Sequence, residues 1–168
     1  KRWEDNPTRS QDPEVYPGLN GHVRYEEGLF IGDRHYDRQG LEPMFAFGHG
    51  LGYTSFDLTD LQVVASGDGA KLSARVTNTG ARAGSTVVQV YVGDIESSAP
   101  RPARELKTFS KISLAAGETR EISLDLPARA FAFWDDAARC WRVEAGVFRI
   151  EAGFSAADIR DVAEVVLG

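Results

Sequence analysis

Four consecutive residues, Arg34, His35, Tyr36 and Asp37, carry side chains that could do chemistry. A guanidinium group, an imidazole, a phenol and a carboxylate together supply the hydrogen-bond donors and acceptors that recognition of a sugar requires. The same groups also suit an interface in which charged and aromatic side chains pair across a contact. We favour the interface, because the motif lies upstream of a change in sequence pattern near Phe56, and we keep the four residues as candidates for substrate binding.

The stretch FAFGHGLGYTSF places Gly48, Gly50 and Gly52 around His49. Glycine-rich loops can hold phosphate groups, but a P-loop needs a Gly-Lys-Ser/Thr sequence that opens a helix after a strand. Tyr53 and a β-like sequence follow the glycines here. We therefore expect tight backbone bends rather than a phosphate-binding or catalytic loop.

The histidines do not predict a metal site. His22, His35 and His49 are spaced 13 and 14 residues apart without a paired cysteine, which is not the ligand spacing of a zinc site. We expect no metal and no cofactor.

Two pairs of neighbouring carboxylates are poor candidates for an acid/base pair. Glu26 and Glu27 are adjacent, so on a strand their side chains would point to opposite faces. Asp135 and Asp136 belong to the polar sequence WDDAAR, which predicts a hairpin turn with solvated side chains.

Two tryptophans, Trp134 and Trp141, flank this turn. Exposed tryptophans could form a platform on which sugar rings stack. We favour packing beneath the turn, because Trp141 has the same strand parity as the apolar Val143.

The composition of the 168 residues is that of an ordinary globular protein, with 42% apolar and 26% charged residues. The net charge is -6 at pH 7 and the basic residues are scattered, which argues against nucleic acid or an anionic membrane as a partner. The lone Cys140 excludes an internal disulfide. No apolar run approaches the roughly 20 residues of a membrane span, and bacterial cytoplasm, periplasm and secretion all stay open.

The chain changes character near Phe56. Prolines and glycines interrupt residues 1–55, where only HVRYEEGLFIGDRHYD predicts a short strand followed by a turn. The segment contains too many aromatic residues for a disordered tail. They are Tyr16, Tyr25, Phe30, Tyr36, Phe45, Phe47 and Tyr53. Because a long irregular segment cannot bury such side chains by itself, we expect another part of a protein to cover them.

Downstream of this point, apolar residues recur at every second position, the pattern of strands with one buried face. Four runs show it: Leu72, Ala74 and Val76; Val88, Val90 and Val92; Ile122, Leu124 and Leu126; Phe148, Ile150 and Ala152. Turn sequences separate the runs, and no convincing helix interrupts them. About seven short strands in roughly 110 residues predict an antiparallel β-sandwich of immunoglobulin or fibronectin type III shape.

Four blocks of this sequence resemble a known family. The blocks VRYEEGLFIGDRHYD, EPMFAFGHGLGYTSF, VTNTGARAGSTVVQVYVGD and RELKTFSKISLAAGETREISLDL match, in this order and spacing, the C-terminal end of glycoside hydrolase family 3 β-glucosidases. The resemblance implies that residues 1–55 are the last segment of an α/β sandwich domain with its linker. It implies that residues 56–168 are a fibronectin type III-like domain.

The resemblance also implies an interface where the chain leaves the α/β domain, whose sheet would cover the aromatic residues upstream. The predicted interface residues are Glu27, Phe45, Phe47, His49 and Tyr53. The family keeps the Glu-Gly pair at Glu27, for which we expect a structural role. Asp33 stands where family members often have an aromatic residue, so an aromatic sugar contact at this position loses its support.

The reaction that the resemblance implies is retaining hydrolysis of terminal non-reducing β-D-glucosyl residues. In such a reaction one carboxylate attacks the anomeric carbon and a second carboxyl group acts as acid and then as base. The family carries its nucleophilic Asp and its acid/base Glu in motifs N-terminal to this sequence, so no catalytic residue is assigned in this chain. We expect the chain alone to be inactive.

The implied partner is an upstream catalytic polypeptide with a barrel domain and an α/β sandwich domain. The β-glucoside or oligosaccharide substrate would be bound by the whole enzyme, whose homo-oligomeric state stays open. The chain does not look like a natural beginning, and we expect either a nicked fragment or a separate subunit.

Two alternatives stay open. Relatives in the family include β-xylosidases and other exo-acting glycosidases, so the sugar is not fixed. A non-catalytic sandwich that binds carbohydrate or protein would show a row of exposed aromatic residues on one sheet face. The outward positions are mostly polar, with Tyr91 as the main exception.

Overall fold

The structure is a computed structural model and describes residues 12–168. An irregular segment with one helix, α1 (Asp33–Gln39), precedes a β-sandwich. The strands of the sandwich are β1 (Phe56–Ser66), β2 (Gly69–Asn78), β3 (Gly84–Asp94), β4 (Glu105–Leu114), β5 (Thr119–Leu126), β8 (Gly146–Ser155) and β9 (Asp158–Leu167). Between β5 and β8 lie the short helix α2 (Ala128–Phe131) and a hairpin of β6 (Phe133–Asp135) and β7 (Cys140–Arg142).

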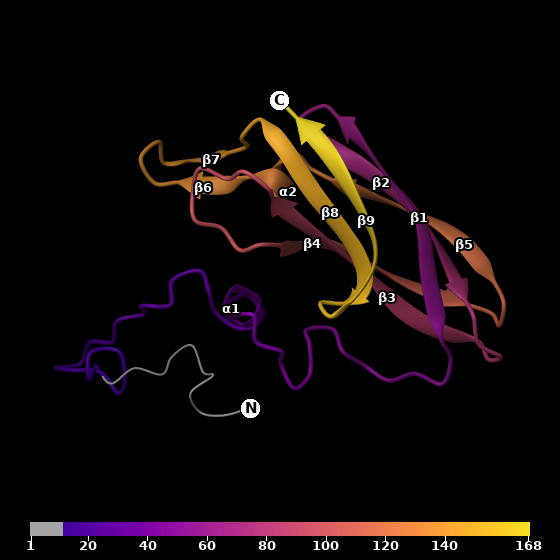
Figure 1. Cartoon of the computed structure of the whole chain (residues 1–168), viewed down its shortest axis with the longest axis horizontal. Coiled ribbons are helices and arrows are strands. Elements are labelled where there is room, and N and C mark those ends of the chain that lie inside the picture. The colour runs from indigo at the N-terminus through magenta and orange to yellow at the C-terminus, as the bar shows by residue number, and fades with distance from the viewer. Residues whose placement is uncertain (1–11) are drawn as a thin grey trace.

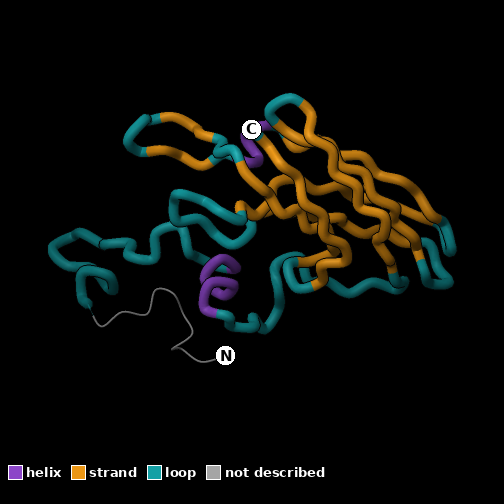
Figure 2. The backbone as a smooth tube through the Cα atoms, turned by 45° about the horizontal axis from the view of Figure 1, so that its top comes forward, coloured by secondary structure: helices purple, strands orange, loops and turns teal. Residues whose placement is uncertain are grey.

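Two antiparallel sheets face each other (Figure 1). One has the strand order β1-β2-β5 and the other β4-β3-β8-β9, and the predicted antiparallel sandwich is confirmed. Residues 12–55 run along one side of the sandwich and enter β1 at the end remote from the β6-β7 hairpin (Figures 1 and 2).

The core follows from the alternating sequence pattern. On β2 the side chains of Leu72, Ala74 and Val76 are buried, whereas Lys71 and Arg75 are exposed. The same pattern on the facing sheet buries a further set of apolar side chains: Val88, Val90, Val92, Phe148, Ile150 and Ala152. Removing these side chains from water is the main favourable contribution to folding.

The short helix α2 closes one end of this core. Its Phe131 ring lies edge-on to the ring of Phe148, with centroids 5.0 Å apart, and both rings are fully buried. The predicted absence of helices downstream of Phe56 is therefore wrong by this one turn. Four residues are too few for a helical period to show in sequence.

The outer face of β3 also departs from prediction. Tyr91 and Gln89, which the pattern places outward, are 1% and 6% exposed. The segment before the sandwich lies against this face, where the Ala156 N–H donates a hydrogen bond to the Phe47 carbonyl. Residues 88–93 of β3 are thus covered on both faces, and Tyr91 is no candidate for an exposed binding platform.

The upstream segment contains a helix where the sequence predicts a strand and a turn. Gly32 and Gly40 bracket α1, and Gly40 ends it in the left-handed conformation with φ 62°. Glycine adopts this backbone without the steric cost that a side chain brings. The helix spans two turns and buries no residue completely, so it lacks the apolar stripe that would reveal it in sequence.

One buried amide organises the entry into the sandwich. Asn78 is fully buried and accepts hydrogen bonds from the Thr54 hydroxyl, at 2.6 Å, and from the Gly80 N–H. It donates to the carbonyls of Arg82 and Leu114. A single side chain therefore joins the linker, the β2-β3 turn and the end of β4.

We predict that Asn78→Ala lowers the free energy of unfolding by about 3 kcal/mol, because it leaves buried carbonyls without donors. Urea titration followed by circular dichroism measures this change. The matched control is Gln62→Ala, which removes an exposed amide from β1 and should stay within about 0.5 kcal/mol. Equal stabilities of the two variants would contradict the organising role of Asn78.

Candidate functional site

Helix α1 carries the sequence motif of residues 34–37 and brings two of its charges onto the sandwich. Arg34 Nη2 lies 3.1 Å from Glu105 Oε1, and Arg104 Nε lies 3.1 Å from Asp37 Oδ2. His35 and Tyr36 contact each other edge to face, with ring centroids 5.8 Å apart. The outer members of the motif thus make long-range ion pairs within the chain, while the two rings stay partly exposed.

Arg104 is the centre of these contacts. Besides Asp37, its guanidinium donates to Glu151 Oε2 at 2.9 Å and to the Ala156 carbonyl at 2.8 Å, and it lies 5.5 Å from the centroid of the Tyr91 ring. Burial lowers the pKa of Arg104, but hydrogen bonds to Asp37 and Glu151 outweigh burial and raise it. The side chain stays protonated and joins α1, β8 and the β8-β9 turn.

Beside Arg104, the backbone of Gly48 lies close to the side chain of Gln89. The Tyr91 hydroxyl donates to Gln89 Oε1, and burial is the main cause that raises the pKa of Tyr91 to about 12. Gly48 packs on the same amide: a Cβ atom there would lie 2.1 Å from Gln89 Nε2, and its φ is 84°. Only glycine fits this position without displacing Gln89.

Three of the predicted interface residues are aromatic and largely exposed. Phe45, Phe47 and Tyr53 are 69%, 53% and 93% exposed. His49 packs against Phe45 with ring centroids 5.2 Å apart. Glu27 is partly buried and forms no ion pair with any residue in the described part of the chain. Their role as a domain interface stays a prediction.

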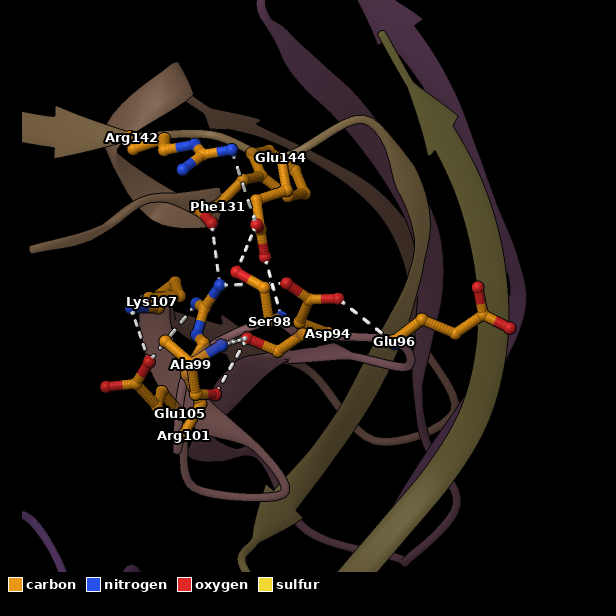
Figure 3. Close-up of polar contacts among 11 residues, drawn as sticks. Asp94, Glu96, Ser98, Ala99, Arg101, Glu105, Lys107, Phe131, Arg142 and Glu144 are labelled. Carbon is orange, nitrogen blue, oxygen red and sulfur yellow. Dashed lines mark hydrogen bonds and ion pairs between the residues drawn. The ribbon is translucent and has the colours of Figure 1, made fainter. Parts of the chain in front are cut away.

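A cavity of about 820 Å³ opens on the other side of α1, between Arg34, the loop of residues 95–104 and the β6-β7 hairpin. Arg101 supports its floor with a side chain only 6% exposed. The guanidinium donates to Asp94 Oδ2 at 3.1 Å and to the Phe131 carbonyl at 3.0 Å (Figure 3). Glu105 lies beside Arg101 and also meets Lys107 at 3.1 Å.

The two tryptophans line this cavity rather than packing beneath the hairpin turn. Trp134 and Trp141 are 44% and 48% exposed, and their ring centroids are 5.5 Å apart at 62°. The Arg129 guanidinium lies 3.1 Å from the centroid of the Trp141 ring. The predicted burial of these rings is wrong, because the three-residue strands of the hairpin pair only with each other and extend from the sandwich (Figure 1).

Within residues 12–168, no group of three or more His, Cys, Asp or Glu side chains is placed to hold a metal ion. The helices of this range are also too short or too polar to cross a membrane.

Comparisons with known proteins agree with this architecture. Residues 86–156 match the fibronectin type III-like domain family. Thermostable β-glucosidase B of Acetivibrio thermocellus is 44% identical over 148 residues, which are 86% of this chain and 20% of that protein. The crystal structure of a Bifidobacterium adolescentis GH3 β-glucosidase superposes with a TM-score of 0.91 at 41% identity, covering 98% of this chain and 24% of the other.

The chain is a homologue of the C-terminal part of family 3 glycoside hydrolases. It spans about a fifth of the length of the curated relatives that it matches. The relatives differ in their sugars, since an exo-α-(1→6)-L-arabinopyranosidase of Bifidobacterium longum is 42% identical over 161 residues, 94% of this chain and 21% of that protein.

Several residues that hold together the surroundings of Arg104 and of the cavity were not predicted from the sequence of this family 3 homologue. Arg104, Glu151 and Gln89 were not singled out, and neither was Arg101. A weak signal existed in the sequence RPARE, which sets two arginines and a glutamate in a proline-broken loop. The partners of Arg104 lie 47 or more positions away in the sequence, so the spacing of residues along the chain does not reveal these contacts.

We predict that Arg104→Ala loosens residues 33–50 of the family 3 homologue from the sandwich. The substitution removes the hydrogen bonds to Asp37 and to the Ala156 carbonyl and leaves the buried Glu151 with only the more exposed Arg149 as its cation. Amide hydrogen exchange in residues 33–50 should therefore accelerate at least tenfold. Arg75→Ala is the control, because its ion pair with Asp60 is exposed on both sides and contributes little. Unchanged exchange in Arg104→Ala would contradict the fastening role.

Lowering the pH should destabilise the fold through Glu105, the carboxylate beside Arg101 at the floor of the cavity. Burial raises the pKa of this carboxyl, but Lys107, Arg34 and Arg101 lower it by more, so its net pKa is below the ordinary 4.5. A depressed pKa contributes stability that is present above pH 4.5 and lost as the pH falls through the folded-state value.

Glu105→Gln should therefore lower the free energy of unfolding by about 2 kcal/mol at pH 7, and the difference from the parent should shrink as the pH falls below 4.5. Urea titrations at a series of pH values measure it. Glu121→Gln, an exposed change on β5, serves as control. A difference independent of pH would show that the ion pairs of Glu105 do not stabilise the fold.

Proposed function

We propose that this chain is the C-terminal part of a retaining, exo-acting β-glycosidase that hydrolyses terminal non-reducing β-D-glucosyl residues, and that it stabilises the catalytic domains. Similarity to β-glucosidases over most of the chain supports the reaction class. The observation that carries the stabilising role is an apolar surface on residues 12–55 that stays exposed in the described part of the chain.

That surface is large for a segment of this size. Most of the exposed large apolar side chains of the described chain belong to it: Tyr16, Leu19, Val23, Tyr25, Leu29, Ile31, Met44, Phe45, Phe47, Leu51 and Tyr53. Leu51 and Tyr53 are 96% and 93% exposed, next to the point where β1 begins. Apolar surface of this kind marks a site that another polypeptide covers.

In this proposal, residues 1–55 complete an α/β sandwich domain and residues 56–168 are the fibronectin type III-like domain that follows it. Arg34 and Asp37 hold the first segment on the second domain through Glu105 and Arg104. The catalytic nucleophile and the acid/base residue lie in the upstream polypeptide, where two carboxyl groups roughly 5 Å apart flank the sugar. In this way the sandwich fixes the position of residues 12–55, against which the upstream polypeptide packs.

Other sugars are the first alternative. An arabinopyranosidase among the relatives shows that a chain of this sequence type occurs with another specificity. A binding module without catalysis is less well supported, because Phe109 is the one aromatic residue of the seven sandwich strands, within the described chain, that is largely exposed.

The test is reconstitution. The purified 168-residue chain should not hydrolyse an aryl β-glucoside, whereas the chain combined with its upstream polypeptide should, and the upstream polypeptide alone should lose activity faster on heating. Turnover by the isolated chain would refute the proposal, as would full activity and stability of the upstream polypeptide without it.

We predict that Tyr53→Asp weakens association with the upstream polypeptide at least tenfold, since the interface would bury an unpaired carboxylate. The stability of the isolated chain should change by no more than about 0.5 kcal/mol, because this ring is almost fully exposed. Phe109→Asp, which alters a 65% exposed ring on β4, is the matched control. Equal association of both variants would place the interface elsewhere.

A further inference from the structure

The cavity beside the β6-β7 hairpin is built from parts that hold one another in place. Arg101 joins the loop of residues 95–104 to α2 through the Phe131 carbonyl. Glu144 fixes the same loop by accepting hydrogen bonds from the Ser98 hydroxyl and, at 2.9 Å, from the Ser98 N–H (Figure 3). The cavity is therefore formed before any ligand arrives, and its volume of about 820 Å³ lies within the range of small-molecule sites.

Its most conspicuous lining is aromatic. About half of the surface of Trp134 and of Trp141 is exposed, although indole rings are usually buried when only packing is required. Arg129 stacks on Trp141, and the ring of Trp134 meets that of Trp141 edge to face. These contacts fix the orientation of both rings, which lowers the entropic cost of stacking a flat ligand on them.

The charges around the cavity balance. Five cations line it: Arg34, Arg101, Lys107, Arg129 and Arg142. Five carboxylates line it or pair with those cations: Asp94, Glu105, Asp135, Asp136 and Glu144. Because the formal charges cancel, the site offers little net attraction for a phosphate or a carboxylate and favours a neutral ligand with many hydroxyl groups.

Two of these polar groups form no ion pair within residues 12–168, Asp136 and Arg129. The Arg129 guanidinium stacks on Trp141, so the N–H groups at its edge are what it offers to a ligand. The other four cations that line the cavity each meet a carboxylate: Arg34, Arg101, Lys107 and Arg142. A carboxylate that accepts and a guanidinium that donates, set beside aromatic rings, match the hydroxyl-bearing edge and the apolar face of a pyranose.

We propose that this cavity binds a neutral oligosaccharide, with one pyranose ring against Trp134 and Trp141 and its hydroxyl groups on Asp136 and Arg129. The choice of a glucosyl chain as ligand rests on the proposed function. The site itself rests only on the geometry of the hairpin and the loop that faces it.

The experiment titrates the 168-residue chain with cellotriose, following heat by calorimetry and the indole N–H signals by NMR. Saturable binding that shifts the signals of Trp134 and Trp141 is expected, and a trisaccharide of uronic acids should bind at least tenfold more weakly. Absence of saturable binding at millimolar cellotriose, or equal binding of the charged sugar, would overturn the proposal.

Variants locate the site. Trp134→Ala should weaken cellotriose binding about tenfold, equivalent to about 1.4 kcal/mol, and Phe109→Ala should leave it unchanged. Asp136→Asn, at an exposed position that forms no ion pair with residues 12–168, tests the same site if the tryptophan variant fails to fold, and should weaken binding several-fold. Unaltered binding in a folded variant of either residue would refute the assignment.

The binding result and the hydrolysis result are separable. Cellotriose binding that depends on Trp134 while the reconstituted protein hydrolyses no glucoside would refute the proposed function and leave the binding site standing. Hydrolysis without such binding would do the reverse.

Discussion

Arg104 joins the segment upstream of the sandwich to the sandwich itself. Its guanidinium meets Asp37 of α1, the nearly buried Glu151 of β8 and the carbonyl of Ala156, and it lies over the ring of Tyr91. A planar group with five donors can satisfy several acceptors from different elements at once, which an ammonium group cannot do in a fixed geometry. The irregular segment therefore has a defined place on the sandwich although it contributes few apolar side chains to the core.

Polar groups position the segment, and apolar groups hold the sandwich together. Inside the sandwich, alternating aliphatic residues and the Phe131–Phe148 contact fill the space between two sheets. The buried Asn78 at the end of β2 and Arg104 in the loop before β4 each join pieces of chain that are distant in sequence. This division leaves the aromatic residues of the segment free to face another polypeptide.

The β6-β7 hairpin forms a surface outside the two sheets of the sandwich. Its three-residue strands pair only with each other, so Trp134 and Trp141 cannot reach the core and instead line a cavity with the loop of residues 95–104. Ion pairs around Arg101 and Glu105 keep that loop in place and leave the cavity close to electrically neutral. The chemistry of this surface follows from which charges are paired.

Alternating apolar residues such as Leu72, Ala74 and Val76 were enough to predict the sandwich, because this local pattern shows which face of a strand is buried. The four matched blocks likewise indicated the family. Three features could not be predicted from the sequence pattern: the cover over Tyr91 and Gln89, the helix of residues 33–39 and the exposure of the two tryptophans. Tyr91 and Gln89 are covered by residues distant in sequence, Arg104 and Gly48. The helix is too short and too exposed to show an apolar stripe, and the tryptophans belong to a hairpin that pairs with neither sheet. Periodicity reports the environment of a face but not which distant charge or segment will meet it.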